Sequence, residues 1–481
     1  MIPERFEPVL EAVRPLADAF ADAGHRLYLV GGIVRDLLVG EVDPTDDAPE
    51  DWDFTTDARP DEIEAVVRGF TGVEAVWTQG KRFGTIGCRI AVEWDGATRS
   101  VAHEITTHRA EAYSPDSRKP DVEFSTDIEA DLSRRDFTVN AMALALPGPD
   151  GPDARLVDPF DGMADLLVHK ALRTPLAPEE SFADDPLRML RAARFLNRFD
   201  LTPDPELVLA VEKMTDRLQP EKGIVSAERI RDELCRLVVL DDCAAGLWFL
   251  CDTGLAHEFF PELPEMRVEQ DPIHRHKDVL AHTIAVVNNT SPTLVLRLAA
   301  LFHDIGKPAT RAIGDNGVSF HHHEVVGARM TRRRMKALRF SNEMIDDVTQ
   351  LVFLHLRFHG YGDDAWTDAA VRRYVRDAGH LLDELNELTR CDCTTRNQKK
   401  ARMLARRMDA LEARIARLQE QEELDKIRPD LDGQQVMDIL GIEPGRTVGE
   451  ALSFLLEARM EEGPLGEEEA TRRLRAWWST R

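Results

Sequence analysis

Residues 51–56 read DWDFTT, and this stretch decides how the N-terminal part of the chain is interpreted. We interpret it as a strand. Side chains alternate between the two faces of a strand, so Asp51 and Asp53 are expected on one face and Trp52 on the other. Two carboxylates on one face can share a hard divalent cation such as Mg²⁺. The alternative is a solvated acidic surface, because acidic residues are frequent throughout this chain.

The segments around this strand predict an α/β head. Upstream we expect a helix at 6–24, a strand at 25–32 (HRLYLVGG) and a helix at 33–40 closed by Gly40. Downstream we expect a helix at 61–70, two strands within 75–96 and another strand at 98–109. After about residue 145 the strand signals mostly end, and helical patterns follow a Gly- and Pro-rich connector at 146–162. The expected architecture is an α/β head followed by an all-α body.

Length and composition indicate a soluble multidomain protein. The chain has 481 residues, too many for one hydrophobic core, and 43% of them are hydrophobic and 31% charged. No apolar run approaches the roughly 18–20 residues that span a bilayer, and the N-terminus does not resemble a secretory signal. The six cysteines have neither disulfide-framework nor zinc-ribbon spacing, which favours a reducing, cytoplasmic setting.

The net charge of −26 argues against polyanionic partners, but one segment opposes this average. Residues 394–418 contain eight Lys or Arg and two acidic residues, and they are predicted to be helical. Such a helix could follow a phosphate backbone. It could equally be an ordinary amphipathic helix with a solvated face.

A glycine turn precedes the aspartate strand. Gly31 and Gly32 lie between the expected strand and helix, where glycine allows close backbone approach and the helix start offers free N–H groups to an anion. Arg35 would add positive charge for a phosphate. Glu104, within another strand-like segment, is the candidate for a third carboxylate. Two cations roughly 4 Å apart could activate an attacking hydroxyl and stabilise a leaving phosphate.

A second motif lies at 182–195 (FADDPLRMLRAARF), which has helical spacing. Asp185 and Arg188 are three residues apart and would share a helix face, as a surface salt bridge does. Alternatively, the pair reads a base. Cytosine and adenine both present an amine beside an unprotonated ring nitrogen, so a carboxylate can accept from the amine while a guanidinium donates to the nitrogen. Guanine and uracil present the opposite polarity and would be rejected.

Histidines and aspartates in the body suggest a second metal site. Scattered histidines are usually satisfied core or surface residues. His303 and Asp304, however, are adjacent at a predicted helix end, with His282 before them and Asp392 after them. Although the side chains of neighbouring helical residues diverge, partners from other helices could bring these groups onto one metal ion.

Four head motifs, in order, carry a family resemblance: LVGGIVRDLLVG (29–40), DWDF (51–54), EITTHR (104–109) and RRDFTVNAMAL (134–144). They resemble the head of the class II tRNA nucleotidyltransferases, the CCA-adding enzymes, and of their poly(A) polymerase relatives. The resemblance implies a nucleotidyltransferase palm with a small mixed sheet and Mg²⁺ ligands at Asp51 and Asp53. It also implies nucleotide contacts from Gly31, Gly32, Arg35 and Arg135. An acidic insertion at 41–50 departs from the family pattern.

The neck and body carry further resemblances. Residues 184–188 are similar to the E-D-x-x-R motif of the same family, with Asp184 in place of the glutamate. This implies that Asp185 and Arg188 replace a nucleic-acid template, with Arg191 and Arg194 near the nucleotide. The order H…HD…D resembles the HD superfamily of metal phosphohydrolases. It implies that a divalent transition metal is bound by His282, His303, Asp304 and Asp392, that Lys307 contacts a phosphate, and that His323 contacts a second metal or a phosphate.

We therefore expect a head at 1–165, a helical neck at 166–265, an HD domain at 266–400 and a helical, tRNA-binding tail at 401–481. The resemblance implies addition of C, C and A to tRNA 3′ ends from CTP and ATP, with Mg²⁺, in the cytoplasm and without a membrane or an obligate protein partner. An additional HD phosphohydrolase activity is a further expectation. The alternatives are a poly(A) polymerase, a CC- or A-adding partial enzyme, an HD-type RNA-end phosphohydrolase, or a non-enzymatic RNA-binding scaffold.

Overall fold

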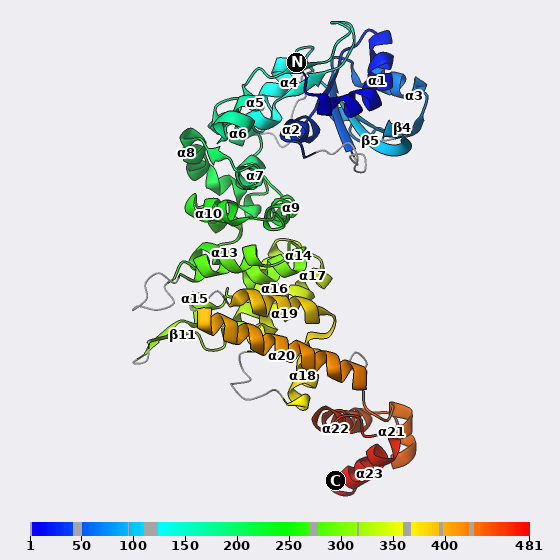
Figure 1. Ribbon diagram of the computed structural model, residues 1–481, viewed down its shortest axis with the longest axis vertical. Helices are drawn as coiled ribbons and strands as arrows, with labels where there is room; N and C mark the ends of the chain where they lie inside the picture. Colours follow the sequence, from blue (N-terminus) through cyan, green and yellow to red (C-terminus); the bar gives the residue numbers. More distant parts are fainter. Residues whose placement is uncertain are drawn as a thin grey trace. The chain divides into compact units, whose positions relative to one another are not determined.

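The computed structural model (Figure 1) describes residues 2–41, 51–94, 96–109, 124–268, 278–314, 317–358, 367–393, 398–422 and 428–481. They form two compact units, one comprising Met1–Leu237 with Asp242–Phe259 and the other Val238–Asp241 with Phe260–Arg481. The acidic insertion, apart from Glu41, lies outside the described residues. Within the described ranges, no helix is both long enough and apolar enough to cross a membrane.

The first unit begins with the expected mixed sheet, which has seven strands in the order β3-β4-β5-β2-β1-β6-β7. β2 and β5 are parallel, and the other neighbouring strands are antiparallel. The strands are β1 (Leu27–Val30), β2 (Asp51–Thr56), β3 (Val73–Trp77), β4 (Thr85–Trp94), β5 (Ala97–Thr107), β6 (Ala143–Ala145) and β7 (Arg155–Val157). β7 lies inside the segment expected to be only a connector. Three residues flanked by Gly, Pro and Asp are too few to give a periodic signal.

Helices cover this sheet and bury its apolar side chains. The head contains α1 (Glu7–Asp22), α2 (Gly32–Val39), α3 (Pro60–Gly69), α4 (Ile128–Ser133) and the 3₁₀ turns η1 (Glu4–Phe6), η2 (Lys81–Phe83) and η3 (Thr138–Asn140). α1 and α3 both pack on β4, as the blue helices beside the sheet in Figure 1 illustrate. α1 buries Val9, Val13 and Leu16, whose spacing of three and four residues forms one helix face.

Helices follow the sheet within the same unit. They are α5 (Gly162–Ala164), the π-helix η4 (Asp165–His169), α6 (Pro178–Asp184), α7 (Leu187–Arg198), α8 (Pro205–Met214), η5 (Thr215–Leu218), η6 (Pro220–Lys222), α9 (Ala227–Val238), α10 (Ala244–Asp252) and α11 (Leu255–Phe259), with a short parallel pair β8 (Ala171–Leu172) and β9 (Thr202–Pro203). The prediction of a single helix over 182–195 is wrong, because the structure has two helices there, α6 and α7. Asp185 is extended, with φ −140° and ψ 100°, and separates α6 from α7. Pro186 causes this break, because proline disfavours helical geometry in the residue before it.

The second unit is helical apart from the hairpin of β10 (Ala312–Gly314) and β11 (Gly317–Ser319), which the sequence did not predict. Its helices are α12 (Glu262–Glu265), α13 (Val279–Asn289), α14 (Leu294–Phe302), α15 (Lys307–Thr310), α16 (His323–Ala337), α17 (Asn342–Leu354), α18 (Asp368–Ala378), η7 (Gly379–Leu381), α19 (Leu382–Asp392), α20 (Gln398–Glu422), α21 (Gly433–Leu440), α22 (Arg446–Glu462) and α23 (Glu467–Ser479). The helix predicted in the basic segment is thus confirmed from Gln398 onward.

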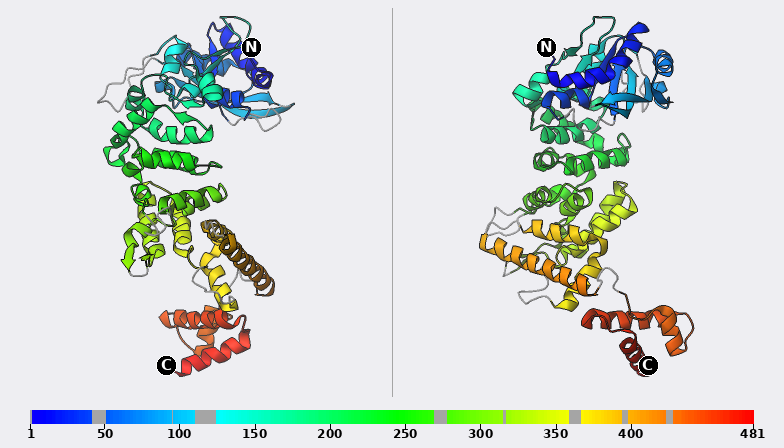
Figure 2. Two further views of the ribbon diagram at one scale, coloured as in Figure 1. Left: turned by 60° about the vertical axis from the view of Figure 1, so that its left-hand side comes forward. Right: turned by 45° about the vertical axis from the view of Figure 1, so that its right-hand side comes forward.

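The long helix α20 packs on α18 and α19, and both views in Figure 2 show it in orange. Arg390 of α19 donates to Glu412 of α20 at 2.6 Å, and Arg414 of α20 donates to Asp368 of α18 at 2.7 Å. The expected boundary at residue 400 therefore falls inside a continuous helix that packs with the helices before it. The final helices α21–α23 have an apolar core of their own, formed by Leu431, Val436, Val448, Ala451, Leu455, Ala470 and Leu474.

Candidate functional site

Three carboxylates share one face at the centre of the head sheet. Asp53 on β2 lies opposite Val30 on β1 and opposite Glu104 on β5. Asp51, Asp53 and Glu104 are exposed, whereas Trp52 is fully buried on the other face. The alternation predicted for this strand is confirmed, and the strand register places Glu104 beside Asp53. Carboxylate oxygens are the ligands that Mg²⁺ prefers, so this group fits such an ion.

The negative charge of Asp53 is disfavoured by the surroundings of its carboxyl group. Solvent reaches the side chain from the open face, but the surrounding protein removes much of the hydration of its carboxyl group, and this raises the pKa to about 6. Arg135 opposes the shift, while Glu104 and Asp51 add to it. Negative groups held this close together are stabilised by a bound cation.

The glycine turn is fitted to Asp53. Gly31 has φ +80°, and a Cβ atom there would lie 3.1 Å from Asp53 Oδ2. Glycine adopts this left-handed geometry without strain. α2 begins at the next residue, Gly32, so the free N–H groups of its first turn start beside the carboxylates. A phosphate beside the metal site could be bound by these groups.

Arg35 is buried at the junction between the head and the neck helices. Its side chain is 4% exposed, and its Nε donates to Asp36 at 2.8 Å. It also donates to Asn140, and its guanidinium lies 5.2 Å from the ring centre of Phe195 on α7 and 4.5 Å from that of Phe199, the residue after α7. These contacts attach α2 to α7. The nucleotide contact predicted for Arg35 stays a prediction.

Asp136 connects this arginine to a second one. One oxygen of Asp136 accepts from Asn140 Nδ2 at 3.0 Å, and the other lies 2.7 Å from Arg191 on α7. Burial raises the pKa of Asp136, but the positive charge of Arg191 and the bond from Asn140 outweigh it, so the pKa is lower than usual. Asp136 stays ionised in the interior and holds Arg191 in place.

Asp185 lies in the break between α6 and α7, Arg188 lies in the first turn of α7, and both are half-buried. Asp185 accepts from the N–H of Leu187 at 3.1 Å and from Arg229 of α9 at 2.8 Å. Arg188 donates to Ser181 Oγ at 2.8 Å and to the carbonyl of Arg134. The base-reading role of this pair stays a prediction, and these contacts are the ones that a base would replace or use.

The other predicted nucleotide-site arginines have protein partners too. Arg194 is 9% exposed, and its Nε donates to the buried Glu233 of α9 at 2.8 Å. Arg135 bonds to the buried Asp131 at 3.3 Å. Sequence patterns did not indicate Glu233 or Asn140, because their partners Arg194 and Arg35 come from distant segments. Asp131 was not indicated either, although Arg135 is only four residues away.

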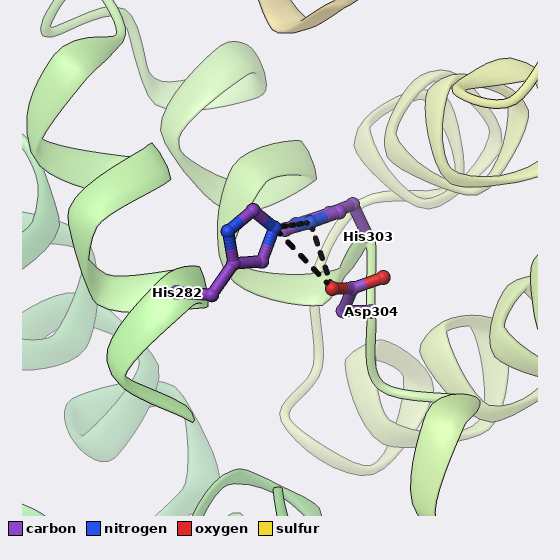
Figure 3. Close-up of side chains that lie close together, drawn as sticks. All are labelled: His282, His303 and Asp304. Atoms are coloured by element: carbon purple, nitrogen blue, oxygen red, sulfur yellow. Dashed lines mark hydrogen bonds and ion pairs between the residues drawn. The ribbon is translucent and has the colours of Figure 1, made fainter. Parts of the chain in front are cut away.

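A second cluster forms in the second unit, where the ends of several helices meet. Figure 3 shows His282 of α13 beside His303 and Asp304, which follow α14. The Nε2 atoms of His282 and His303 are 3.4 Å apart. The distance from His303 Nε2 to Asp304 Oδ2 is 3.2 Å. Asp392, at the end of α19, lies 2.9 Å from His282 Nε2. The structure thus brings together all four residues predicted as metal ligands.

Two more histidines lie on the other side of Asp304. His323 Nε2 is 3.4 Å from Asp304 Oδ1 and 3.3 Å from His355 Nε2. His323 was a predicted candidate, but His355 was not assigned a role from the sequence. The apolar neighbours of His355 in LVFLHLRF suggest a core position, and only the fold brings α17 to the cluster.

Two buried carboxylates lie within the cluster and interact with positively charged groups. Burial raises the pKa of the Asp304 and Asp392 carboxyl groups, but neighbouring groups outweigh it. His303 and Lys307 lower the pKa of Asp304 well below its usual value. His282 and His303 do the same for Asp392. Burial likewise lowers the pKa of His303, yet Asp304 and Asp392 raise it to about 10. Lys307 Nζ lies 2.6 Å from Asp304 Oδ2. This pocket favours positive charge, and its mixed nitrogen and oxygen donors suit a divalent transition metal.

Three family models match the chain. The poly(A) polymerase head domain matches residues 27–172, the family described as a probable RNA- and SrmB-binding site of polymerase A matches 200–266, and the HD domain matches 279–420. β2, which carries Asp51 and Asp53, lies in the region matched by the head domain, and the His–Asp cluster lies in the region matched by the HD domain.

Comparison with characterised proteins finds relatives that are named as nucleotide-adding enzymes. The chain is 36% identical over 343 residues to an A-adding tRNA nucleotidyltransferase of Deinococcus radiodurans, covering 69% of this chain and 75% of that protein. It is 32% identical to a CCA-adding enzyme of Lactobacillus gasseri, covering 61% of this chain and 63% of that enzyme. The crystal structure of a Bacillus stearothermophilus CCA-adding enzyme in complex with CTP has a similar fold. Its TM-score is 0.64 at 21% identity, and the match covers 100% of this chain and 99% of that one.

Replacing Gly31 tests the fit between the glycine turn and Asp53. We expect Gly31→Ala to cost about 1–2 kcal/mol in stability because of its positive φ, and also to weaken Mg²⁺ binding by displacing Asp53. Gly24→Ala is the matched control, since Gly24 has φ +82° but a Cβ there meets no atom within 4 Å. Thermal unfolding and calorimetric Mg²⁺ titration measure the two effects. Equal Mg²⁺ affinity in the two variants would contradict the fit.

Proposed function

Because the chain belongs to the tRNA nucleotidyltransferase family, with 36% identity across 75% of the D. radiodurans relative, we propose that it extends tRNA 3′ ends without a nucleic-acid template. The observation that carries this proposal is the strand register. It sets Asp53 opposite Glu104, with Asp51 on the same face and the Gly31 turn alongside. CTP and ATP are the proposed substrates, and the proposed location is the cytoplasm.

The proposed product is the complete C-C-A sequence. The CCA-adding relatives and the similar fold of an enzyme bound to CTP support it. The A-adding relative supports the narrower alternative, in which the chain adds only the terminal adenosine. Poly(A) synthesis, or addition of C and C alone, is the remaining alternative within the family.

Different residues of the head have different proposed roles in the reaction. Asp51 and Asp53, with Glu104, would hold Mg²⁺, which activates the 3′-hydroxyl of the tRNA and stabilises the charge on the leaving pyrophosphate. The first turn of α2 binds the triphosphate through backbone N–H groups. Arg135, which is held by Asp131, adds positive charge next to Asp53.

The base is selected at the junction between α6 and α7. Asp185 accepts from the exocyclic amine of cytosine or adenine, and Arg188 donates to the adjacent ring nitrogen. Ser181 and the carbonyl of Arg134 orient Arg188, while Arg229 orients Asp185. Their geometry is therefore fixed by protein contacts before a nucleotide arrives, which reduces the entropy cost of binding.

The basic helix α20 is the proposed tRNA-binding surface of the second unit. Leu404, Met408 and Leu411 are buried on one face, whereas Arg402 and Arg406 are exposed on another. Basic side chains in this arrangement can contact consecutive phosphates. Although the protein as a whole is negative, the surface that contacts the tRNA would then be locally positive.

A second activity is proposed for the His–Asp cluster. His282, His303, Asp304 and Asp392 would hold a divalent transition metal that polarises a phosphoester. Lys307, now 2.6 Å from Asp304, would contact the phosphate. The proposed substrate is a phosphate at an RNA end, either a 2′,3′-cyclic phosphate or a monoester.

Incorporation of radiolabelled nucleotides tests the primary proposal. With tRNA lacking its 3′ end, we expect C, C and A to be added and the reaction then to stop. Asp53→Asn should reduce incorporation more than about 100-fold, since even outer-shell changes at metal sites cost up to that factor. Asp61→Asn, an exposed acid in the next helix, is the control. Addition of A only, and only to tRNA ending in C-C, would favour the narrower activity, and continued addition of A would identify a poly(A) polymerase.

Nucleotide competition tests the base-reading pair. Asp185→Ala should lower the preference for CTP and ATP over UTP and GTP by about 10- to 100-fold, the effect of one buried hydrogen-bonding group. Glu179→Ala removes a nearby acid of α6 that pairs with Lys213, and it should leave the preference unchanged. An Asp185→Ala enzyme that is slower but equally selective would contradict the base-reading role.

Hydrolysis of 2′,3′-cyclic AMP tests the second activity. His282→Asn should abolish metal-dependent hydrolysis while incorporation on tRNA stays within about twofold, because His282 and the head carboxylates belong to separate compact units and share no ligand. Hydrolysis that persists in this variant would assign the activity to other residues or to a contaminant.

A further inference from the structure

We propose that the indole ring of Trp77 binds the last base of the tRNA 3′ end by stacking against it. Trp77 is the final residue of β3, the strand at one edge of the head sheet. The proposal rests on the nucleotidyl transfer proposed above and adds to it a binding site for the attacking end of the tRNA. By holding the terminal base, the ring would place the 3′-hydroxyl beside a cation at Asp53.

The strand register aligns Trp77 with the carboxylates of the head. Trp77 on β3 lies opposite Gly87 on β4. Gly87 lies in turn opposite Glu104 on β5, which lies opposite Asp53 on β2. Residues directly opposite one another project from the same face of a sheet, so Trp77 belongs to the face that carries the carboxylates. Neighbouring strands are roughly 4.8 Å apart, which puts Gly87 roughly 10 Å from Asp53. This distance is comparable to the span of one nucleotide from its 3′-hydroxyl to its base.

The indole of Trp77 lies over Gly87, the residue between it and Glu104. A Cβ atom at Gly87 would be 1.9 Å from Nε1 and 2.1 Å from Cε2 of the ring. The ring therefore occupies the space that a side chain on β4 would fill, and glycine at this position lets an aromatic surface lie one strand closer to the carboxylates. Covering a glycine in this way also stabilises a sheet, so the ring has a structural role as well.

Part of the indole remains available to a ligand. Trp77 is only half-buried, whereas Trp52 on the opposite face of the sheet is fully buried. Within the part of the chain that the structure describes, the Nε1–H group of Trp77 donates to no acceptor, although a buried indole usually finds one. Every base has an aromatic face, so stacking tolerates any sequence. Addition of C, C and A needs such tolerance, because a different nucleotide ends the tRNA before each step.

The chemistry of the reaction places the tRNA end on the same side of β2 as Trp77. The proposed triphosphate site is the first turn of α2, which begins at Gly32 directly after β1. β1 lies on one side of β2, whereas β5, β4 and β3 lie on the other. The attacking and leaving oxygens of a phosphoryl transfer lie roughly in line, on opposite sides of the phosphorus. Because pyrophosphate leaves towards β1, the 3′-hydroxyl approaches from β5 and β4.

Two exposed arginines lie close to the ring in the fold. Arg89 follows Gly87 by two residues on β4 and so projects from the same face, and Arg82 lies in η2, between β3 and β4. Neither forms an ion pair with a described residue, since Arg89 donates to the carbonyl of Ser100 at 3.4 Å and Arg82 lies over the ring of Phe83. Positive charge beside an aromatic ring is the usual way of binding a single strand. These arginines would contact the phosphates of the last nucleotides.

Removing the ring and the base, separately and together, tests the contact. The full-length protein and its Trp77→Ala variant are titrated, with Mg²⁺ but without nucleotide, against fluorescently labelled tRNA ending in C-C. A second tRNA lacks only the terminal cytosine base and ends in a bare ribose. We expect Trp77→Ala to raise the dissociation constant of the intact tRNA about 10-fold, the loss typical of one stacked base. The two proteins should bind the tRNA without that base equally, because ring and base act as one pair.

Three further variants separate stacking from stability. Trp77→Phe keeps an aromatic ring and should bind the intact tRNA within about threefold of the unmodified protein. Gly87→Ala displaces the ring without removing it and should reproduce the loss seen in Trp77→Ala. Val76→Ala is the matched control, since Val76 is the half-buried neighbour on the other face of β3, and it should leave tRNA binding unchanged.

Two results would overturn the proposal: full affinity of Trp77→Ala for the intact tRNA, or an equal loss of affinity with and without the terminal base. If Trp77→Ala does not fold, Trp77→Leu takes its place, because leucine still covers Gly87 with apolar atoms. Unchanged binding of the intact tRNA by Trp77→Leu would then count against stacking. Failure of the proposed function is seen separately, since the unmodified protein would then incorporate no nucleotide into any truncated tRNA.

Discussion

The two-sided pairing of β2 is the constraint on which the head depends. β1 pairs with it on one edge in antiparallel fashion, and β5 pairs on the other in parallel fashion, so Asp53 lies between Val30 and Glu104. A slip of one residue would exchange the faces of the strand. It would bury the aspartates and expose Trp52, which is fully buried. The free energy of burying this ring therefore holds the carboxylates at the surface, where a metal ion and a nucleotide can reach them.

Buried charges connect this sheet to the neck helices. Arg35, Asp136 and Arg194 are each less than a tenth exposed, and each has a partner on another segment. Removing one partner of such a pair leaves an uncompensated charge in the interior, which costs several kcal/mol, about 3–5 in measured cases. The arginines implied as nucleotide contacts are thus also structural. Their positions are set by protein carboxylates and amides.

The sequence allowed accurate prediction wherever a local pattern was long or a chemical motif was complete. The alternation around Asp53 was sufficient to predict β2, and the glycines before α2 were sufficient to predict the turn. The order of the His and Asp residues in the body was sufficient to predict the cluster of His282, His303, Asp304 and Asp392. Short strands such as β7 were missed because three residues contain no period. The break at Pro186 was visible but was outweighed by helical spacing on both sides. His355, Glu233 and Asn140 could not be assigned, since their partners are brought close only by tertiary packing.

Gly306 lies so close to the main chain of the His–Asp cluster that a Cβ atom there would be 2.2 Å from the carbonyl oxygen of His323, and this contact has an evolutionary consequence. Any side chain at 306 would push α16, which begins at His323, away from the segment that carries Asp304. A substitution at this position would displace several residues of the cluster together, whereas loss of one histidine removes a single side chain. If the proposed hydrolysis is under selection, that selection should therefore act strongly on a residue that has no functional group. Lineages that no longer need this chemistry should lose the glycine as readily as the ligands.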